Sequence, residues 1–198
     1  MAVLDFPIEA NSISWGFDEK DQALESPMDD TEQAVNLTGG KWRASIDFVN
    51  VTPSRMSQLR GFLMKLKGQA GRFYLSPPNY KPQGYAPVST QGRVNGGSQV
   101  GNSLITDGWT PSLLIFKSGD YIEVNGELKV VVDDCMSNAT GQATLSIEPE
   151  LRTSPLDNGL IEVNEPRCVM KLVNGSSLEW AMSLQEVFHL SLECKEVV

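Results

Sequence analysis

The chain contains many short segments in which hydrophobic and polar residues alternate. In the clearest of them, between positions 41 and 49, every second residue is hydrophobic: Trp42, Ala44, Ile46 and Phe48. A period of two is typical of a β-strand with one buried face. Further strands are predicted at 13–15, 71–75, 143–147, 168–173, 178–184 and 188–194. Residues 1–40 are expected to form short strands and turns, with a turn at Thr38–Gly40.

Residues 120–134 are predicted to form a β-hairpin around Asn125-Gly126. Asn-Gly between alternating segments is a strong turn signal, because both turn residues take positive φ angles. The alternating hydrophobic residues are Ile122 and Val124 before the turn and Leu128, Val130 and Val132 after it.

One segment has the periodicity of an α-helix. Its hydrophobic stripe consists of Met56, Leu59, Phe62, Leu63 and Leu66. Thr52 is expected to cap this helix, Pro53 suits its first turn, and Gly68 is expected to end it. The opposite face is expected to carry four basic residues, Arg55, Arg60, Lys65 and Lys67.

The distribution of proline and glycine predicts an insertion. Residues 76–101 are rich in both, which is typical of a linker or a long crossing loop. Residues 103–149 follow with a purely β pattern, and 151–158 resemble a returning linker. We therefore predict a discontinuous first domain, residues 1–80 and 156–198, with a small β-barrel domain inserted at 81–155. The predicted fold class is mainly β, a sandwich or barrel with one flanking helix.

The charge of the chain limits the possible functions. The 198 residues include 16 Lys+Arg and 25 Asp+Glu, a net charge of −9, which argues against a free-standing nucleic-acid-binding protein. No hydrophobic segment approaches the roughly 20 residues that cross a bilayer, and no signal peptide is recognisable. Neither membrane insertion nor secretion is therefore expected.

Basic residues are concentrated in residues 41–72, which hold seven of them against one acidic residue. The local net charge is +6, which leaves −15 for the rest of the chain. A solvated helix face explains this simply. The more specific hypothesis is that the basic surface meets an acidic surface of a neighbouring subunit. The candidate subunit-contact residues are Arg55, Arg60, Lys65 and Lys67.

Residues for catalysis or metal binding do not form a recognisable pattern. The single histidine, His189, lies between two hydrophobic residues, so alternation places it on an exposed strand face. The adjacent acids Asp29-Asp30 and Asp133-Asp134 lack the regular spacing of a calcium loop. The three cysteines are expected to be buried reduced thiols: Cys135, Cys168 and Cys194. We expect no enzymatic activity, no metal and no cofactor.

Two aromatic residues of the inserted segment are candidate contacts for a sugar or a protein partner. These are Trp109 and Tyr121. Burial in a small β core is the simpler alternative, because aromatic side chains dominate such cores.

Several short motifs, taken in order, resemble those of distal tail proteins of long-tailed bacteriophages. The resemblance extends over about residues 12–173, and each motif alone is weak. The motifs are Gly39-Gly40-Lys41-Trp42, Leu59–Gly68, Gly71–Leu75, Gly101-Asn102-Ser103-Leu104, Gly108-Trp109, Gly119-Asp120-Tyr121-Ile122, Glu148–Arg152 and Ser154-Pro155.

The resemblance implies a structural virion protein without catalytic residues. It implies a hexameric ring at the distal end of the phage tail, with a first domain like the tail-tube protein. Such a ring would join the tail-tube protein to the tip or hub protein of the baseplate. An inserted β-domain would project outward and hold tail fibres or contact sugars. DNA would pass through the ring without specific binding, and the protein would be made in the bacterial host cytoplasm.

Two other functions are compatible with the residues. A carbohydrate-binding module would use Trp109 and Tyr121 as an exposed sugar platform. A cell-wall hydrolase would need two suitably placed carboxylates, and no local pattern selects such a pair.

Overall fold

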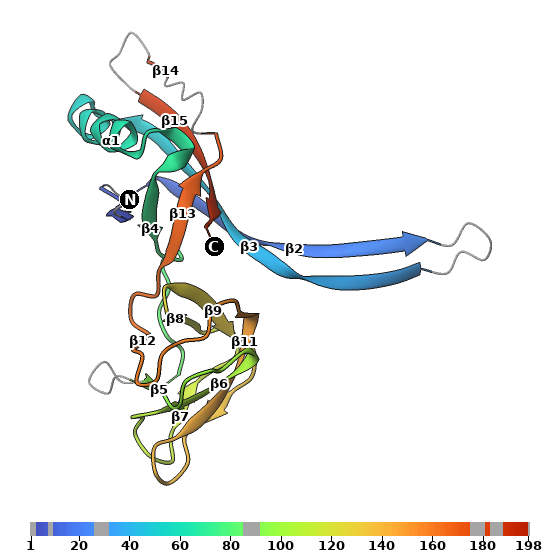
Figure 1. Ribbon diagram of the computed structural model, residues 1–198. Coiled ribbons are helices and arrows are strands. Elements are labelled where there is room, and N and C mark those ends of the chain that lie inside the picture. Colours follow the sequence, from blue (N-terminus) through green and yellow to red (C-terminus); the bar gives the residue numbers. More distant parts are fainter. Residues whose placement is uncertain are drawn as a thin grey trace. The chain divides into compact units, whose positions relative to one another are not determined.

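The computed structural model describes residues 3–7, 10–25, 32–84, 92–174, 181–182 and 188–197. This part of the chain is mainly β, with a nearly closed, barrel-like sheet. It divides into two compact units (Figure 1). Unit 1 contains Met1–Leu75 and Val169–Val198, and unit 2 contains Ser76–Cys168. The unit limits differ from the predicted boundaries at 80 and 156, and an inserted domain stays a prediction.

Unit 1 is built on one sheet with the order β1-β4-β13-β15-β3-β2, and β14 pairs with β15 outside this path. The strands are β1 (Val3–Asp5), β2 (Ser12–Glu25), β3 (Glu32–Val51), β4 (Arg72–Leu75), β13 (Cys168–Leu172), β14 (Ala181–Met182) and β15 (Phe188–Glu196). The C-terminal strands thus complete the sheet that begins before residue 76, as predicted. Of the strand expected at 178–184, only β14 lies within the described residues.

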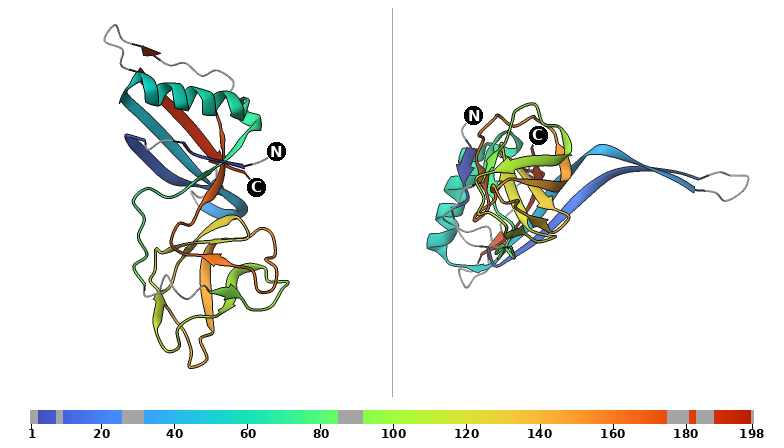
Figure 2. Two further views of the ribbon diagram at one scale, coloured as in Figure 1. Left: turned by 90° about the vertical axis from the view of Figure 1, so that its left-hand side faces the viewer. Right: turned by 90° about the horizontal axis from the view of Figure 1, so that it is seen from below.

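The core of unit 1 lies between this sheet and the helix α1 (Pro53–Leu66), which a short 3-10 turn, η1 (Gly68–Ala70), follows (Figure 2). All five residues of the predicted hydrophobic stripe are buried. The ring of Phe62 lies 5.1 Å from Phe6 and 5.8 Å from Phe73 of β4. The predicted alternation of β3 is confirmed, since Trp42, Ala44, Ile46 and Phe48 are all buried.

The ends of α1 differ from the expectation in detail. Thr52 occupies the N-cap position, but its side chain makes no capping hydrogen bond. Its carbonyl oxygen instead accepts the Met56 N–H at 2.9 Å. Lys67 takes the left-handed conformation at the C-terminal cap, and Gly68 begins the 3-10 turn.

The N-terminal strands are far longer than predicted. β2 and β3 have 14 and 20 residues and pair from Ser12↔Asp47 to Glu25↔Glu32. The predicted turn at Thr38–Gly40 is wrong, because β3 continues through it. Between the pairs Asp18↔Lys41 and Lys20↔Leu37, one residue of β2 lies opposite three of β3. This bulge requires glycine, since Gly39 has φ +106° and a Cβ on Gly40 would lie 2.6 Å from the Phe17 ring.

Unit 2 contains a six-stranded sheet with the order β12-β8-β9-β11-β6-β5 and a β10-β7 pair. The strands are β5 (Arg93–Val94), β6 (Gly101–Asp107), β7 (Leu114–Phe116), β8 (Tyr121–Val124), β9 (Glu127–Val131), β10 (Cys135–Met136), β11 (Ala143–Leu151) and β12 (Ile161–Glu162). β5 also bonds to the segment before β12, through Val94 N–H to Gly159 O and Asn158 N–H to Val94 O, both 2.9 Å. These bonds nearly close the sheet into a barrel.

The predicted hairpin at 120–134 is confirmed, with Asn125 at φ 53° and Gly126 at φ 76°. Of the alternating residues predicted for its second strand, Leu128 is buried as expected, whereas Val130 is half-buried and Val132 is exposed. Leu128, Lys129 and Val131 are buried, whereas Val132 is 39% exposed. The register pairs Ile122 with Lys129, so a charged residue occupies the core face opposite a buried isoleucine.

Candidate functional site

The outer parts of β2 and β3 form a two-stranded ribbon that leaves the sheet of unit 1 (Figure 1). We call this ribbon the arm and define it as Lys20–Glu25 of β2 and Glu32–Leu37 of β3, which pair in register. The described hydrophobic side chains of this ribbon include Leu24, Val35 and Leu37, which are 56%, 43% and 38% exposed.

The two faces of the arm differ in character. Cross-strand partners share a face, and the register pairs Lys20 with Leu37 and Gln22 with Val35. Leu24 lies two residues beyond Gln22 and therefore shares this face. Asp21 points to the other face, with the pair Ala23↔Ala34. The three exposed large hydrophobic residues therefore share one face of the arm with Lys20, Gln22 and Gln33, and we call this face the apolar face.

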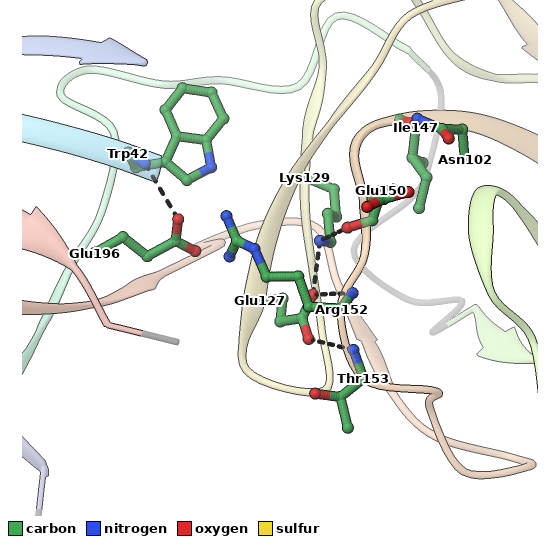
Figure 3. A network of polar contacts seen from close by, with 9 residues as sticks. All are labelled: Trp42, Asn102, Glu127, Lys129, Ile147, Glu150, Arg152, Thr153 and Glu196. Carbon is green, nitrogen blue, oxygen red and sulfur yellow. Dashed lines mark hydrogen bonds and ion pairs between the residues drawn. The ribbon is translucent and has the colours of Figure 1, made fainter. Parts of the chain in front are cut away.

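Charged residues hold the strands at the point where the arm leaves the sheet. Asp18 accepts contacts from Arg43 Nε at 3.1 Å and from Lys195 Nζ at 3.2 Å. The last β15–β3 pair is Lys195↔Arg43. Beyond it the carboxylate of Glu196, which is 3% exposed, accepts the Trp42 N–H at 3.1 Å (Figure 3). The Glu196 side chain thus continues the hydrogen bonding between β15 and β3 beyond their last backbone pair.

The four basic residues predicted as a subunit contact are all exposed: Arg55, Arg60, Lys65 and Lys67. The expectation that they share one helix face is wrong. Arg60 is five residues from both Arg55 and Lys65, a spacing that separates side chains by about 140° around a helix axis. Lys67 lies beyond the helix end. The positive charge therefore surrounds the solvent side of α1 instead of forming one patch.

The two aromatic candidates do not form an exposed platform. Trp109 is 3% exposed, and its ring packs edge-on against Phe116 with centroids 5.2 Å apart. Its Nε1 donates to Thr106 Oγ1 at 2.7 Å. A Cβ on Gly92 would come within 1.9 Å of the same ring. Trp109 is thus enclosed in the barrel core, where no sugar ring can stack on it.

Tyr121 is half-buried beside Tyr80, with ring centroids 5.2 Å apart. The Tyr80 hydroxyl accepts the Tyr121 N–H at 3.0 Å. Burial, and next the Asp120 charge, raise the pKa of Tyr80. The buried Asp120 carboxylate also accepts the N–H groups of Gln83 and Gly84 at 2.7 and 3.0 Å. These contacts bind the crossing loop to the barrel and serve its structure.

A buried ion pair in unit 2 was not foreseen from the sequence. Lys129, fully buried, places Nζ 2.6 Å from Glu127 Oε2 and 2.7 Å from the Glu150 carbonyl oxygen (Figure 3). Glu127 also accepts the N–H groups of Arg152 and Thr153, at 3.2 and 3.0 Å. The pair therefore fastens the end of β11 to β9. A two-residue turn at Asn125-Gly126 implies that Lys129 lies opposite Ile122. The sequence therefore already indicated that Lys129 lies on the core face of the hairpin.

The remaining candidates have structural surroundings. His189 is exposed on β15, as predicted. All three thiols are buried, as predicted, and burial, with a smaller contribution from Glu193, raises the pKa of Cys194 to about 12. Asp134 accepts the Ser118 N–H at 2.9 Å, which fits a turn role. Asp29-Asp30 lie outside the described residues. Within the described ranges, no three His, Cys, Asp or Glu residues gather as metal ligands.

Among the described residues, no helix combines the length and the hydrophobicity needed to span a bilayer.

No family model matches the chain, and no curated protein matches it.

Proposed function

We propose that this protein is a structural subunit of a ring at the distal end of a phage tail. In this role it joins the tail-tube protein to the tip or hub protein, holds or contacts tail fibres, and lets DNA pass without specific binding. The proposal places the protein in the virion tail as a hexamer. It rests on the order of the sequence motifs and on one structural observation, the arm.

The arm supports assembly because it lacks a core of its own. An isolated two-stranded ribbon is marginally stable in water, and stability requires further strands or a packed apolar face. Leu24, Val35 and Leu37 share one face and are all exposed. A long edge strand with exposed hydrophobic residues also favours pairing with another chain. Contact with a neighbouring subunit would bury the apolar face, and repetition of that contact would close a ring.

Removing the apolar face of the arm is expected to prevent assembly without unfolding the chain. The change is Leu24→Thr, Val35→Thr and Leu37→Thr together, which keeps β-branched or strand-compatible side chains. Light scattering over a concentration series should show the unchanged chain as a hexamer, or moving toward one. The variant should stay monomeric with an unaltered circular dichroism spectrum.

The matched control carries the same kind of change in unit 2. Ile105, Val132 and Leu160 are 47%, 39% and 43% exposed, and their joint replacement by threonine should leave assembly intact. An unchanged chain that remains monomeric at every concentration would contradict the ring. A triple arm variant that still forms hexamers would remove the arm from the interface.

Reversing the charge around α1 tests the predicted subunit contact separately. Replacing Arg55, Arg60, Lys65 and Lys67 by glutamate should weaken the ring if they face acidic residues of a neighbour. The loss should be greatest at low salt, since exposed ion pairs are screened as ionic strength rises. Light scattering at two salt concentrations measures the effect. Hexamers of unchanged stability would show that the helix lies outside the contact.

A further inference from the structure

The polar face of the unit 1 sheet carries a row of cations on three adjacent strands. Lys171 of β13 lies directly opposite Lys195 of β15, and Lys195 lies directly opposite Arg43 of β3. Register partners share a sheet face, so the three side chains emerge side by side. Adjacent strands are about 4.8 Å apart, which places the row within about 10 Å. We call these three residues the cationic row.

Like charges in direct register oppose folding. Same-sign pairs directly opposite one another destabilise an antiparallel ladder. One carboxylate, Asp18, contacts both Arg43 and Lys195. Among the described residues, no ion pair is formed by Lys171, nor by the neighbouring Lys20 and Lys41. These lysines are therefore positioned to contact an anionic ligand.

A hollow of about 350 Å³ lies against these residues. Its lining includes Lys20, Lys41, Lys171 and Lys195, with Asp18, Glu19 and Glu196. The Glu196 carboxylate is buried and bonded to the Trp42 N–H, and Asp18 is bonded to two row members. The lining thus holds four cations and three carboxylates, a net charge of +1, and one of these carboxylates, Asp18, also contacts Arg43 outside the lining.

From this charge and geometry we propose that the hollow binds a terminal phosphate group, free or as a monoester. Such a group carries a charge of about −1.5 to −2 near pH 7 and offers three acceptor oxygens. It would offset the positive charge of the lining and accept from Lys171, Lys195 and Lys41 together. A single carboxylate offers only two acceptor oxygens, one fewer than the three lysines could use. All its residues come from one chain, so the site does not need a neighbouring subunit to form, although Lys20 also belongs to the arm.

The test is a titration of the full chain with inorganic phosphate, followed by the backbone amide NMR signals. At constant ionic strength, the signals of residues 41, 171 and 195 should shift with saturation, whereas sodium chloride should cause no such shift. The apparent Kd should fall between pH 5.5 and 8, as phosphate becomes the dianion. The variant Lys171→Gln with Lys195→Gln should bind at least about tenfold more weakly, because it loses two charge-assisted hydrogen bonds.

The matched control removes the same charge elsewhere. Arg60→Gln with Lys65→Gln on α1 should leave the Kd for phosphate unchanged. Equal phosphate affinity of the row variant and the unchanged chain would overturn the site. Preference for a 20-base-pair DNA duplex would assign the row to phosphodiesters instead. A further outcome is that the NMR signals shift with a synthetic peptide of residues 18–32 but not with phosphate. The hollow would then be a contact site for protein, and the phosphate assignment would be refuted.

Discussion

Lys129→Ala is expected to lower the free energy of unfolding of unit 2 by about 3–5 kcal/mol. The change leaves Glu127 in the barrel with its charge and without its cation, and it leaves the Glu150 carbonyl without its donor. Removing one member of a buried pair is costly because the remaining charge has lost both water and partner. Chemical denaturation followed by hydrogen exchange of residues 121–131, which lie within unit 2, measures the loss.

Two further variants separate the ion pair from simple loss of side-chain volume. Lys129→Met with Glu127→Gln fills the same space, removes both charges and retains one amide oxygen that can accept the Arg152 or the Thr153 N–H. It should recover part of the lost stability, because no buried charge is left without its partner. Lys117→Ala, at an exposed position, should change stability by no more than about 0.5 kcal/mol. Equal losses for Lys129→Ala and the double variant would contradict the argument.

The same pair gives unit 2 a pH-dependent stability with a defined sign. Burial alone would raise the pKa of Glu127, but the hydrogen bond and charge of Lys129 and the Arg152 N–H lower it overall. A carboxylate with a lowered pKa stabilises the folded state above its unfolded pKa, near 4.5, and loses that contribution as pH falls through the folded pKa. The stability difference between the unchanged chain and Glu127→Gln should therefore shrink below about pH 4.5.

Trp109→Ala is expected to destabilise unit 2 by about 3–5 kcal/mol, the usual cost of removing a buried aromatic side chain. The change opens a cavity beside Phe116 and leaves Thr106 Oγ1 without the indole donor. Hydrogen exchange of residues 121–131, followed by mass spectrometry, would measure the loss without relying on tryptophan fluorescence. Trp109→Phe keeps a ring against Phe116 and should cost far less.

This prediction also distinguishes the two roles considered for Trp109. A sugar-stacking residue on the surface would cost little stability when truncated and would abolish glycan binding. The buried Trp109 should do the reverse, with large loss of stability and no direct contact to a sugar. Stability within 0.5 kcal/mol of the unchanged chain would contradict the core assignment.

The periodic elements were determined by local sequence. The hydrophobic stripe from Met56 to Leu66 has the repeat of an α-helix, and the alternation from Trp42 to Phe48 has the two-residue repeat of a β-strand. Each repeat places the hydrophobic residues on one face, and that face is buried. Asn125-Gly126 also determined its hairpin locally, because its turn needs two positive φ angles. These signals lie within a few residues of each other and depend little on distant parts of the chain.

Other features were decided by residues far apart in sequence. The strand through Gly39-Gly40 looked like a turn, yet pairing with β2 holds it extended as a bulge. Glu196 is buried because β3, 154 residues away, presents the Trp42 N–H there. The cationic row exists only where three strands from distant segments come into register. Local sequence determined which secondary structure each segment can form. Long-range strand pairing decided which charged groups became neighbours, because a side chain's hydrogen-bonding partners and nearby charges come from strands that meet only in the folded sheet.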